Sequence, residues 1–494
     1  MASTNTDRSG REPEVTAKAG TEGHIAQTLY WWDGFAISLS IPAALFIGIG
    51  YTIGALGAVP AIILSCVAAI LAALQNVIYS EMTSMFPQKS GGIAVYANEG
   101  WKNRNVFAGP IAAFGYWFAW ASSLAIYSLQ IGSLSKAQWF PEATGSIALF
   151  GHDFGLEHLF AIVCLVAAWG FNILGMRVAM GAIYITGALV LVPIIGFIAA
   201  PLFTSAWSAD LLTADWTAGG FPIWQVLGAW ALIQIWSVYG IEAVATFTPE
   251  YKKPARDSRR ALRLAGVFCI VVYALVPLGV GGVLDQTEIA NDPTAFYVTA
   301  FERVFGAGGV FMTVCIIAGL ILLMVMTTAD GGRVLHGCAN NGLTIKQLSA
   351  LNRFGVPGRA MSLDLILNLV LIVFIGSTLA VIVAGMIGII VCHILALIGY
   401  VFLRRAKVAP KRETRLSRFW VAVAIAIAAL NSVILVAGAA NANITGYGGP
   451  REILLGLAVL SISVVLYIYR RVVQDKQPLR LRNPEAIDVA PETV

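Results

Sequence analysis

Glu242 is the residue of this chain whose type and surroundings most favour a chemical role. It ends an apolar run that begins at Ala231, it lies two residues after Gly240, and a basic stretch follows from Lys252. A carboxylate inside a membrane helix costs about 3 kcal/mol on insertion scales, so a chain that keeps one usually uses it. Burial disfavours the charged carboxylate, which makes Glu242 a candidate proton acceptor on a solute pathway. The alternative is a structural hydrogen bond to a neighbouring helix.

Two other ionisable groups lie in apolar surroundings. Asp330 is three residues before Arg333, close to the end of an apolar segment. It is a second candidate for coupling, and the alternative is a local ion pair with Arg333. His393 has apolar neighbours and could relay protons, or it could be a hydrogen-bonded core residue.

Adjacent hydroxyl groups at Thr327 and Thr328 suggest an ion site of another kind. Together with backbone carbonyl groups between Ser38 and Ile41 they could bind sodium, because this hard cation prefers oxygen ligands. Threonine hydroxyls in helices also hydrogen-bond to the preceding turn, and this is the alternative for both residues.

The elements that must position these residues are predicted to be membrane helices. The 494 residues are 58% hydrophobic and 12% charged, with a mean hydropathy of +0.77. These values lie outside the range of soluble domains. Apolar stretches of about 20 residues recur along the chain and predict an all-α integral membrane fold with twelve transmembrane helices. The predicted spans are 28–56, 59–83, 106–135, 157–175, 178–201, 222–247, 262–284, 299–336, 361–378, 379–403, 417–439 and 451–470.

The chain ends and the basic residues predict the orientation in the membrane. Residues 1–27 are polar and form a tail rather than a signal peptide, and residues 472–494 form a second tail. With twelve spans both tails lie on one side, and of the 32 Lys and Arg only Lys136, Arg303 and Arg451 lie in loops of the other side. The positive-inside rule makes the tail side cytoplasmic, with the protein in the plasma membrane. The net charge of +5 therefore reflects orientation and argues against a nucleic-acid partner.

The sequence carries no recognisable catalytic or cofactor motif. The six cysteines lie within or at the ends of the spans, without CxxC or histidine-bearing spacing, and are predicted to be small buried packing residues. A P-loop, an HExxH and a GxSxG are missing from the sequence. An ATP-driven pump and a membrane hydrolase are therefore disfavoured, and we predict a protein that is not an enzyme and holds no cofactor.

Two of the predicted spans contain a weak point. In the first span Pro42 follows Ser38 and Ser40, and a proline removes one backbone hydrogen bond, so the helix should kink or unwind at about residues 40–44. The sixth span is weakened within Ser237–Gly240. Broken helices at corresponding places in two halves are typical of transporter binding sites, and a plain kink at the proline is the alternative.

The first ten spans divide into two units of similar length, 28–201 and 222–403. Because five is an odd number, the second unit must be inverted relative to the first. This predicts a five-plus-five inverted repeat with discontinuous helices 1 and 6. The transporter core is then 28–403, and helices 11 and 12 with their preceding basic loop occupy 404–471.

The sixth span and two loop segments carry a set of residues in a specific order. Trp236, Ser237, Gly240 and Glu242 are followed by Glu250, Lys252, Lys253, Pro254, Arg256, Asp257, Arg260 and Ala261, and further segments lie at 79–100 and 331–361. This set resembles the amino acid permeases of the amino acid, polyamine and organocation (APC) transporter superfamily. The resemblance covers nearly all of the chain, and it identifies the family rather than a substrate.

The first span departs from the pattern of this family. Family members usually have a glycine-serine-glycine break whose bare amides face the substrate carboxylate. The corresponding stretch here runs through Ile41, Pro42, Ala43 and Ala44 without glycine. The ends of half-helices can still bind charged groups of a substrate. An N-terminal end favours an anion, and a C-terminal end favours an ammonium group. The lysine that some members place on span 5 at the sodium position is also missing.

The resemblance implies a substrate site where spans 1, 3 and 6 meet. Trp236 occupies the family's aromatic gate position, where a flat ring can cover the substrate, and packing alone is the alternative. Tyr116 and Trp120 share a face of span 3 and could line the same cavity or simply pack. The predicted substrate-binding residues are Ser38, Ser40, Ile41, Pro42, Ala43, Ala44, Trp120, Trp236, Ser237, Tyr239 and Gly240.

The function that the resemblance implies is secondary transport of the APC type. We expect import of an amino acid or a related small amine by alternating access, with proton-coupled uptake as the favoured mode. The open alternatives are a sodium-coupled or exchange-type amine or polyamine transporter, and a solute sensor that does not transport. A membrane enzyme is disfavoured because no nucleophile or metal constellation is present. The expected partners are the small-molecule substrate, a proton or sodium ion, and the lipid bilayer.

Overall fold

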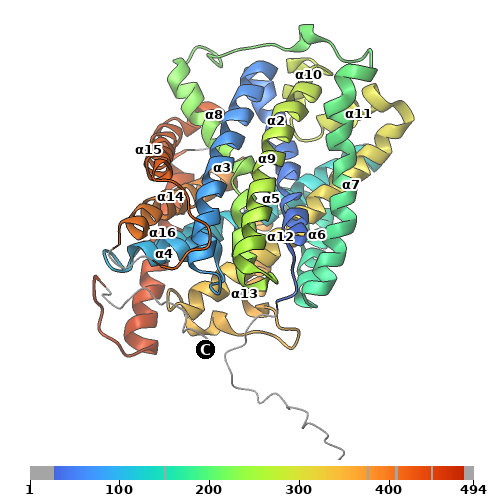
Figure 1. The fold of residues 1–494 in the computed structure, drawn as a ribbon. Coiled ribbons are helices and arrows are strands. Elements are labelled where there is room, and N and C mark those ends of the chain that lie inside the picture. The colour runs from blue at the N-terminus through green and yellow to red at the C-terminus, as the bar shows by residue number, and fades with distance from the viewer. Residues whose placement is uncertain (1–26, 150–151, 375–377, 407–409, 447–448, 483–494) are drawn as a thin grey trace, which may run out of the picture.

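The structure of the protein is a computed structural model that describes residues 27–149, 152–374, 378–406, 410–446 and 449–482. These residues are almost entirely helical (Figure 1). The helices are α1 (Trp31–Ser38), α2 (Ile41–Leu56), α3 (Ala58–Met85), α4 (Gly92–Trp101), α5 (Ala108–Trp139), α6 (Leu156–Ile173), α7 (Met176–Phe203), α8 (Ile223–Val238), α9 (Pro254–Gly281), α10 (Gln286–Asn291), α11 (Phe296–Phe305), α12 (Gly309–Asn340), α13 (Gly358–Phe374), α14 (Thr378–Arg405), α15 (Phe419–Ala440) and α16 (Pro450–Tyr469).

Shorter elements connect these helices. A two-stranded antiparallel hairpin, β1 (Ser146–Leu149) and β2 (His152–Gly155), precedes α6. The 3₁₀ segments are η1 (Ala209–Leu211), η2 (Ile241–Glu250), η3 (Gly306–Gly308), η4 (Lys346–Ser349) and η5 (Ala442–Thr445), and η6 (Arg470–Gln474) is a turn of π-helix.

Ten helical stretches among the described residues are long and apolar enough to cross a membrane. The protein is therefore a membrane protein of helical type. α5 is outside this group because its many Gly, Ser, Tyr and Trp residues lower its mean hydropathy, and α13 because it has only 17 residues. The span predicted at 299–336 lies within one candidate span, Phe296–Asn340, which contains an interruption that was not predicted: η3 separates α11 from α12, and Gly306 has a φ of +55°.

Parts of the predicted tails lie outside the described residues. This holds for 1–26 of the N-terminal tail, for 483–494 of the C-terminal tail, and for 375–377 at the predicted junction of two spans. The first described residues and the last ones lie at the same end of the bundle (Figure 1). We call this end the terminal side.

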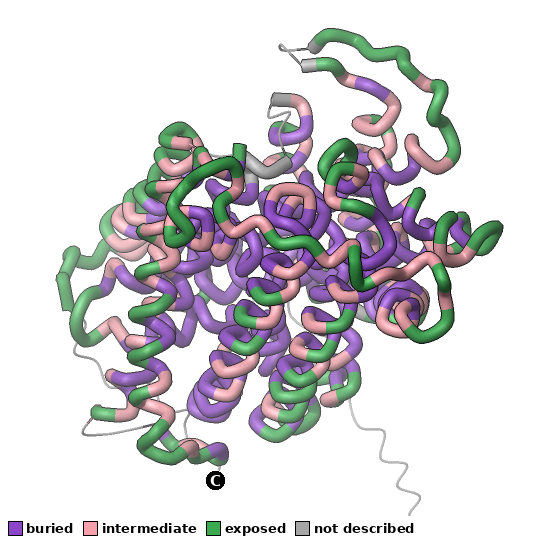
Figure 2. Tube along the Cα trace, turned by 90° about the horizontal axis from the view of Figure 1, so that it is seen from above, coloured by how far each residue is buried: buried purple, intermediate pink, exposed green. Residues whose placement is uncertain are grey.

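The outer surface of the bundle is largely apolar, and several charged groups lie inside its hydrophobic core. Figure 2 shows buried residues gathered in the centre and exposed residues around the edge. Large apolar side chains such as Val267, Val436 and Val465 are more than half exposed on outward faces. Glu242 and Asp330 are buried in the interior. Because soluble proteins have the opposite distribution, the exposed apolar belt indicates a lipid-facing surface.

The packing of the central helices positions the interior groups. α3 lies along α9, and α5 packs against both α12 and α14 (Figure 1). α5 and α14 approach closely at Gly115 and Gly388, where an added Cβ would lie 2.5 Å from a backbone oxygen. Small residues at such crossings are the usual means of close helix contact in membranes. On the terminal side Leu29 forms a parallel bridge with Tyr251, which joins the start of α1 to the end of η2.

Candidate functional site

The sixth predicted span is broken in the middle of the bundle, as the sequence predicts. α8 ends at Val238, Tyr239 is extended, and Gly240 has a φ of +148° before η2 begins. A Cβ at Gly240 would lie 2.6 Å from Trp120 and 2.8 Å from Ile41. Only glycine fits this position, because it tolerates positive φ and has no side chain to collide with the indole.

The first predicted span is interrupted less strongly than expected. Leu39 and Ser40 separate α1 from α2, yet both keep right-handed helical torsions. Residues 41–44 form the first turn of α2, so of the two predicted outcomes, a kink or unwinding at about 40–44, the structure shows the kink. The reason is that Pro42 lies in that first turn. Backbone N–H groups in the first turn of a helix make no intrahelical hydrogen bond, so the N–H that proline lacks is not needed there. The result is a kink rather than an unwound segment.

The serine hydroxyls at the kink are used within the helix. Ser38 donates to the carbonyl of Phe35, and Ser40 donates to the carbonyl of Ile37, each at 2.7 Å. Ser237 donates likewise to the carbonyl of Gln234 at 2.7 Å. Their side chains therefore stabilise the ends of the half-helices. Contact between these hydroxyls and a substrate stays a prediction.

Tyr273 of α9 ties the two interrupted helices together. Its hydroxyl donates to the carbonyl of Ser237 and lies 3.3 Å from the carbonyl of Ile41. The Ser237 carbonyl lies in the last turn of α8 and has no intrahelical partner, so a donor from another helix is needed in the apolar interior. Tyr273 was missed by sequence reasoning, because nothing in its local sequence indicates which distant carbonyls it reaches.

Two tryptophans form an aromatic wall beside the break. The Trp236 indole nitrogen donates to the Ser123 hydroxyl of α5 at 3.3 Å, and its ring centroid is 6.0 Å from that of Tyr127. Trp120 and Tyr116 lie on one face of α5 with ring centroids 6.1 Å apart, as predicted. All four rings are buried. The wall is suited to covering an organic solute, and the gate role of Trp236 stays a prediction.

Glu242 lies at the start of η2 and faces two other groups. Its Oε2 accepts a hydrogen bond from the Gly240 N–H at 2.8 Å. Its Oε1 lies 3.5 Å from Nε2 of His393, whose Nδ1 is 2.8 Å from the Tyr79 hydroxyl. His393 is therefore hydrogen-bonded in the core and also adjacent to the acid. Both interpretations of His393 are compatible with this geometry.

Asp330 is buried without a hydrogen-bond partner for either carboxylate oxygen among the described residues. The hydroxyls of Tyr116 and Thr246 lie beside it, as does Glu242. Arg333 forms its ion pair with Glu250 instead, so the predicted local ion pair with Asp330 is wrong. The physical reason is direction: the guanidinium extends toward η2, where a buried carboxylate needs a counter-charge.

A third interior carboxylate lies close to Asp330. Asp364 of α13 accepts from the Trp117 indole at 2.7 Å, and its other oxygen has no partner among the described residues. Sequence reasoning missed Asp364. Its only signal was a single acid in an apolar stretch, the same signal that selected Glu242.

The two threonines proposed for sodium differ in the structure. Thr328 donates to the carbonyl of Met324 at 2.9 Å, so its hydroxyl bonds back to its own helix. The buried Thr327 hydroxyl has no hydrogen-bond partner among the described residues and lies beside Tyr127. Thr327 thus keeps a free oxygen, and sodium binding there stays a prediction.

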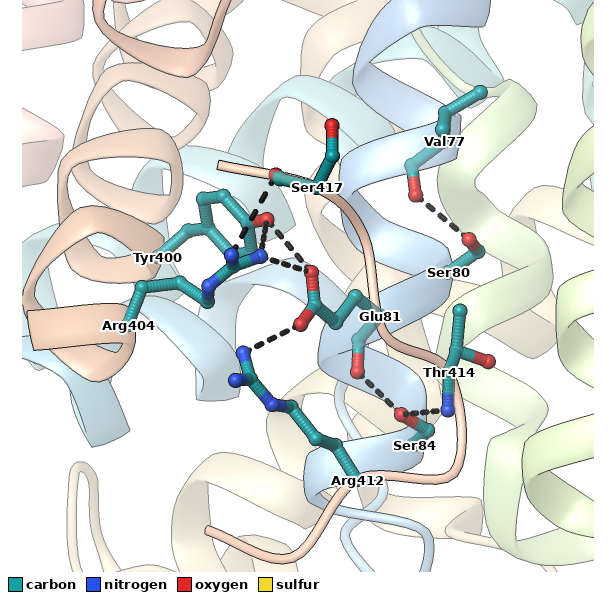
Figure 3. A network of polar contacts seen from close by, with 9 residues as sticks. All are labelled: Val77, Ser80, Glu81, Ser84, Tyr400, Arg404, Arg412, Thr414 and Ser417. Atoms are coloured by element: carbon teal, nitrogen blue, oxygen red, sulfur yellow. Dashed lines mark hydrogen bonds and ion pairs between the residues drawn. The ribbon is translucent and has the colours of Figure 1, made fainter. Parts of the chain in front are cut away.

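A network of charges closes the terminal side (Figure 3). Glu81, near the end of α3, is fully buried and accepts from Tyr400 at 2.7 Å, Arg404 at 2.8 Å and Arg412 at 2.7 Å. The Thr414 N–H donates to Ser84 one turn further along α3. These contacts hold the end of α14 and the loop after it against α3. A pathway to the terminal side must therefore open elsewhere or break these bonds.

Comparison with known proteins gives one family and several relatives. A family model described as amino acid permease matches residues 29–459. The amino-acid permease RocE of Bacillus subtilis (strain 168) is 24% identical over 65% of this chain and 68% of its own length. The arginine/ornithine antiporter ArcD2 of Lactococcus lactis subsp. cremoris (strain MG1363) is 23% identical over 60% and 61%. The putrescine transporter PotE of Escherichia coli (strain K12) is 25% identical over 56% and 60%.

Proposed function

Since the chain belongs to the amino acid permease family, a family of secondary transporters, we propose that it carries an amino acid or a related amine across the plasma membrane by alternating access. The observation that carries the proposal is the broken helix at Gly240, with an interior carboxylate at Glu242 directly after it. Broken membrane helices supply backbone groups to a solute, and interior carboxylates bind protons or cations. An enzymatic role is not part of the proposal.

We propose twelve membrane helices, counting α5 and α13, with two inverted units at 28–201 and 222–403. The helix contacts support this arrangement, because several of them have a counterpart five spans away. The contact of α5 with α14 corresponds to the contact of α12 with α7. The contact of α5 with α6 corresponds to the contact of α12 with α13. α1 and α2 contact α9 as η2 and α8 contact α3. α15 and α16, within 404–471, lie outside both units.

We propose that the terminal side faces the cytoplasm. Both ends of the described chain lie there, which agrees with an even number of spans. Most Lys and Arg residues belong to the tails and to loops of this side, and basic residues favour the cytoplasmic face.

The substrate site is proposed at the junction of α2, α5 and α8. Trp120 and Trp236 wall it, and Tyr239 and Gly240 with the first turn of α2 form its floor. Gly48 of α2 is buried, yet an added Cβ there would meet no atom within 4 Å, so the interior beside α2 is not filled. This unfilled interior lies about two helical turns along α2 from the break and is compatible with a small solute.

The substrate class is proposed to be an amino acid or amine with a cationic group. Two of the relatives are named for arginine, ornithine or putrescine. Near the break the chain offers the carboxylate of Asp330, neither oxygen of which has a hydrogen-bond partner among the described residues, whereas the first turn of α2 has no glycine to expose amides. Carboxylates recognise ammonium and guanidinium groups, and bare amides recognise carboxylates.

We predict that a decarboxylated amine competes noticeably with its parent amino acid. Pro42 has no N–H to donate, and the methyl groups of Ala43 and Ala44 hinder the close approach that glycine permits. The test is competition for uptake into proteoliposomes by arginine against agmatine, ornithine against putrescine, and each amino acid against its amide. A strict requirement for a free α-carboxylate across the panel contradicts the prediction.

Coupling is proposed to use Glu242 as the proton acceptor. The rivals are sodium at Thr327 and obligatory exchange, which the antiporter relative makes relevant. Proteoliposomes with an imposed proton gradient, in sodium or in choline buffer, distinguish these modes: uptake that needs the gradient and not sodium supports the proposal. Concentrative uptake also excludes a solute sensor without transport.

Trp236→Ala is predicted to weaken apparent substrate affinity by about tenfold, or about 1.4 kcal/mol, whereas Trp236→Phe keeps most activity because a ring face remains. Uptake measured against substrate concentration tests this. The matched control is Trp224→Ala, because Trp224 is a mostly exposed residue at the start of the same helix. If Trp236→Ala and Trp224→Ala behave alike, Trp236 is a packing residue only.

A further inference from the structure

A chain of buried hydrogen bonds leaves the break in the sixth span and returns to it. It starts at the Gly240 N–H, passes through η2, α14 and α3, and ends at the hydroxyl of Tyr239, the preceding residue. All members are buried. The members, which we call the polar ring, are Gly240, Glu242, His393, Tyr79, Gln75 and Tyr239.

Four of the five contacts of the polar ring are hydrogen bonds, and the fifth is a longer contact. The Gln75 amide nitrogen donates to the Tyr239 hydroxyl at 2.7 Å, and the Tyr79 hydroxyl donates to the Gln75 oxygen at 3.2 Å. The Tyr79 oxygen lies 2.8 Å from Nδ1 of His393. The remaining contact, from Nε2 of His393 to Oε1 of Glu242, is 3.5 Å. Neither of these two atoms has another partner among the described residues.

The direction of hydrogen bonding in the ring follows from one carbonyl. The side chain of Gln75 also faces the carbonyl oxygen of Leu71 at 3.3 Å. A carbonyl only accepts, so the atom facing it is the amide nitrogen, and the amide oxygen must face Tyr79. Tyr79 then gives its single proton to Gln75. Its oxygen can only accept from His393, which makes Nδ1 of His393 the N–H atom.

The remaining imidazole nitrogen therefore presents a lone pair to Glu242. If Glu242 were ionised and His393 neutral, two acceptor atoms would face each other in the apolar interior without a proton between them. Such an arrangement leaves both buried groups unsatisfied and is unfavourable. One proton held between Oε1 and Nε2 removes the conflict, whichever of the two atoms carries it.

We propose that Glu242 and His393 together bind the coupling proton, and that Tyr79 and Gln75 are positioning residues that fix its place. The inference rests on the proposed proton-coupled transport and names the proton site of that function. When the proton leaves to water, the carboxylate and the imidazole lone pair repel. Because Gln75 and Tyr79 hold His393 in one tautomer, relief comes from movement of Glu242, which carries the bonded Gly240 N–H with it. Proton release thus acts directly on the helix break.

Among the described residues, the other titratable groups that interact electrostatically with Glu242 carry no positive charge. They are Tyr79 and Cys269 from α3 and α9, Tyr116 from α5, Tyr239 at the break, Asp330 from α12, and Cys392 from α14. Phenols and thiols are neutral at physiological pH, and Asp330 is an acid. The described groups around Glu242 therefore supply no cation that could replace the proton, so Glu242 and His393 depend on the proton.

Tyr79→Phe tests the proposal with a defined sign. Without the Tyr79 hydroxyl, neutral His393 can turn its N–H toward Glu242 and stabilise the ionised carboxylate. The pH of half-maximal gradient-driven uptake should therefore move toward acid by about one unit, a tenfold loss of proton affinity. His393→Gln should shift in the same direction, since its amide N–H can also donate to the carboxylate. Substrate exchange at equal pH on both sides should persist in both variants, which reports that they are folded.

The control is His336→Gln, because His336 is a buried histidine of α12 outside the polar ring, and its profile should match the wild type. Nitrogen-15 NMR of ring-labelled histidine gives an independent readout, with the His393 signals identified by their loss in His393→Gln. A neutral His393 ring whose single proton is on Nδ1 supports the proposal. An Nε2–H tautomer, or pH profiles of Tyr79→Phe and His393→Gln identical to the wild type, overturns it. If uptake by the wild type does not depend on the proton gradient, both the proposed coupling and this inference are overturned. If wild-type uptake depends on the gradient but the pH profiles of the variants do not shift, only this inference is overturned.

Discussion

Glu242→Gln is expected to abolish proton-driven accumulation while leaving the protein folded and inserted. The amide keeps the shape of the carboxyl group and can still accept from the Gly240 N–H, which lies 2.8 Å from the native oxygen. Its NH₂ group can donate to the free nitrogen of His393. The variant therefore resembles the protonated state permanently and cannot release a proton. Proteoliposomes with an imposed pH gradient measure the loss as uptake that falls to background.

The control for this experiment is Glu142→Gln, because Glu142 is an exposed acid of a loop and should leave gradient-driven uptake unchanged. Substrate exchange without a gradient should survive in Glu242→Gln, because exchange of two substrates moves no net proton. Unchanged gradient-driven accumulation in Glu242→Gln would remove the residue from coupling. Replacing sodium by choline in the same vesicles then tests Thr327, the hydroxyl of the rival ion site that has no partner.

Local sequence predicts the helices of this protein well because the membrane imposes a single rule on them. Each span must satisfy its backbone internally and face lipid with apolar side chains, so long apolar runs coincide with helices. The break at Gly240 was predictable for the same local reason, since a glycine beside polar residues weakens a helix. The split of 299–336 was missed because an apolar loop helix, α11, continues the apolar run across Gly306.

The kink in the first span was only partly predictable. A proline in the interior of a helix breaks it, but Pro42 lies in the first turn of α2 and is tolerated there. Ile41, which begins the second half-helix, lies close to Gly240, a residue some two hundred positions away. Local sequence carries no information on that contact.

Interior polar contacts were the least predictable part of the site. Glu242 and Asp330 were selected because acids are rare in apolar segments, and both are buried. Their partners come from other helices, as His393 does for Glu242 and as Glu250 does for Arg333. Long-range pairing depends on how the helices pack, so Tyr273 and the members of the polar ring on α3 became visible only with the fold in place.

The terminal side and the helix break are connected through η2. Glu250 at the end of η2 binds Arg333 of α12, and Glu242 at its start binds the break. A change in the charge of Glu242 therefore acts on an element whose other end is held by a buried ion pair. Because breaking a buried pair by removing one partner is strongly unfavourable, η2 should move together with α12 rather than away from it.

Gly240→Ala is expected to abolish transport and to destabilise the protein, and it has the largest structural effect of the substitutions considered. Positive φ costs an L-residue about 1 to 2 kcal/mol, and the new methyl group would lie 2.6 Å from the Trp120 ring and 2.8 Å from Ile41. Overpacking of this kind costs about 1 to 3 kcal/mol more, and its relief must displace Trp120 from the proposed substrate site. Thermal unfolding of the purified protein and uptake in proteoliposomes measure the two effects.

The matched control is Gly181→Ala on α7, because Gly181 is an exposed helical glycine where an added Cβ meets nothing within 4 Å and φ is ordinary. This substitution should leave stability equal or slightly raised, since alanine favours helix over glycine. Adding Gly240→Ala to a Trp120→Ala variant separates the two costs: without the indole the closer clash is gone, so Gly240→Ala should lower the thermal stability less there than in the wild type, while the cost of positive φ remains. Transport should stay low in the double variant, because the aromatic wall is lost. If Gly240→Ala alone transports and unfolds like the wild type, the helix break is not required for function.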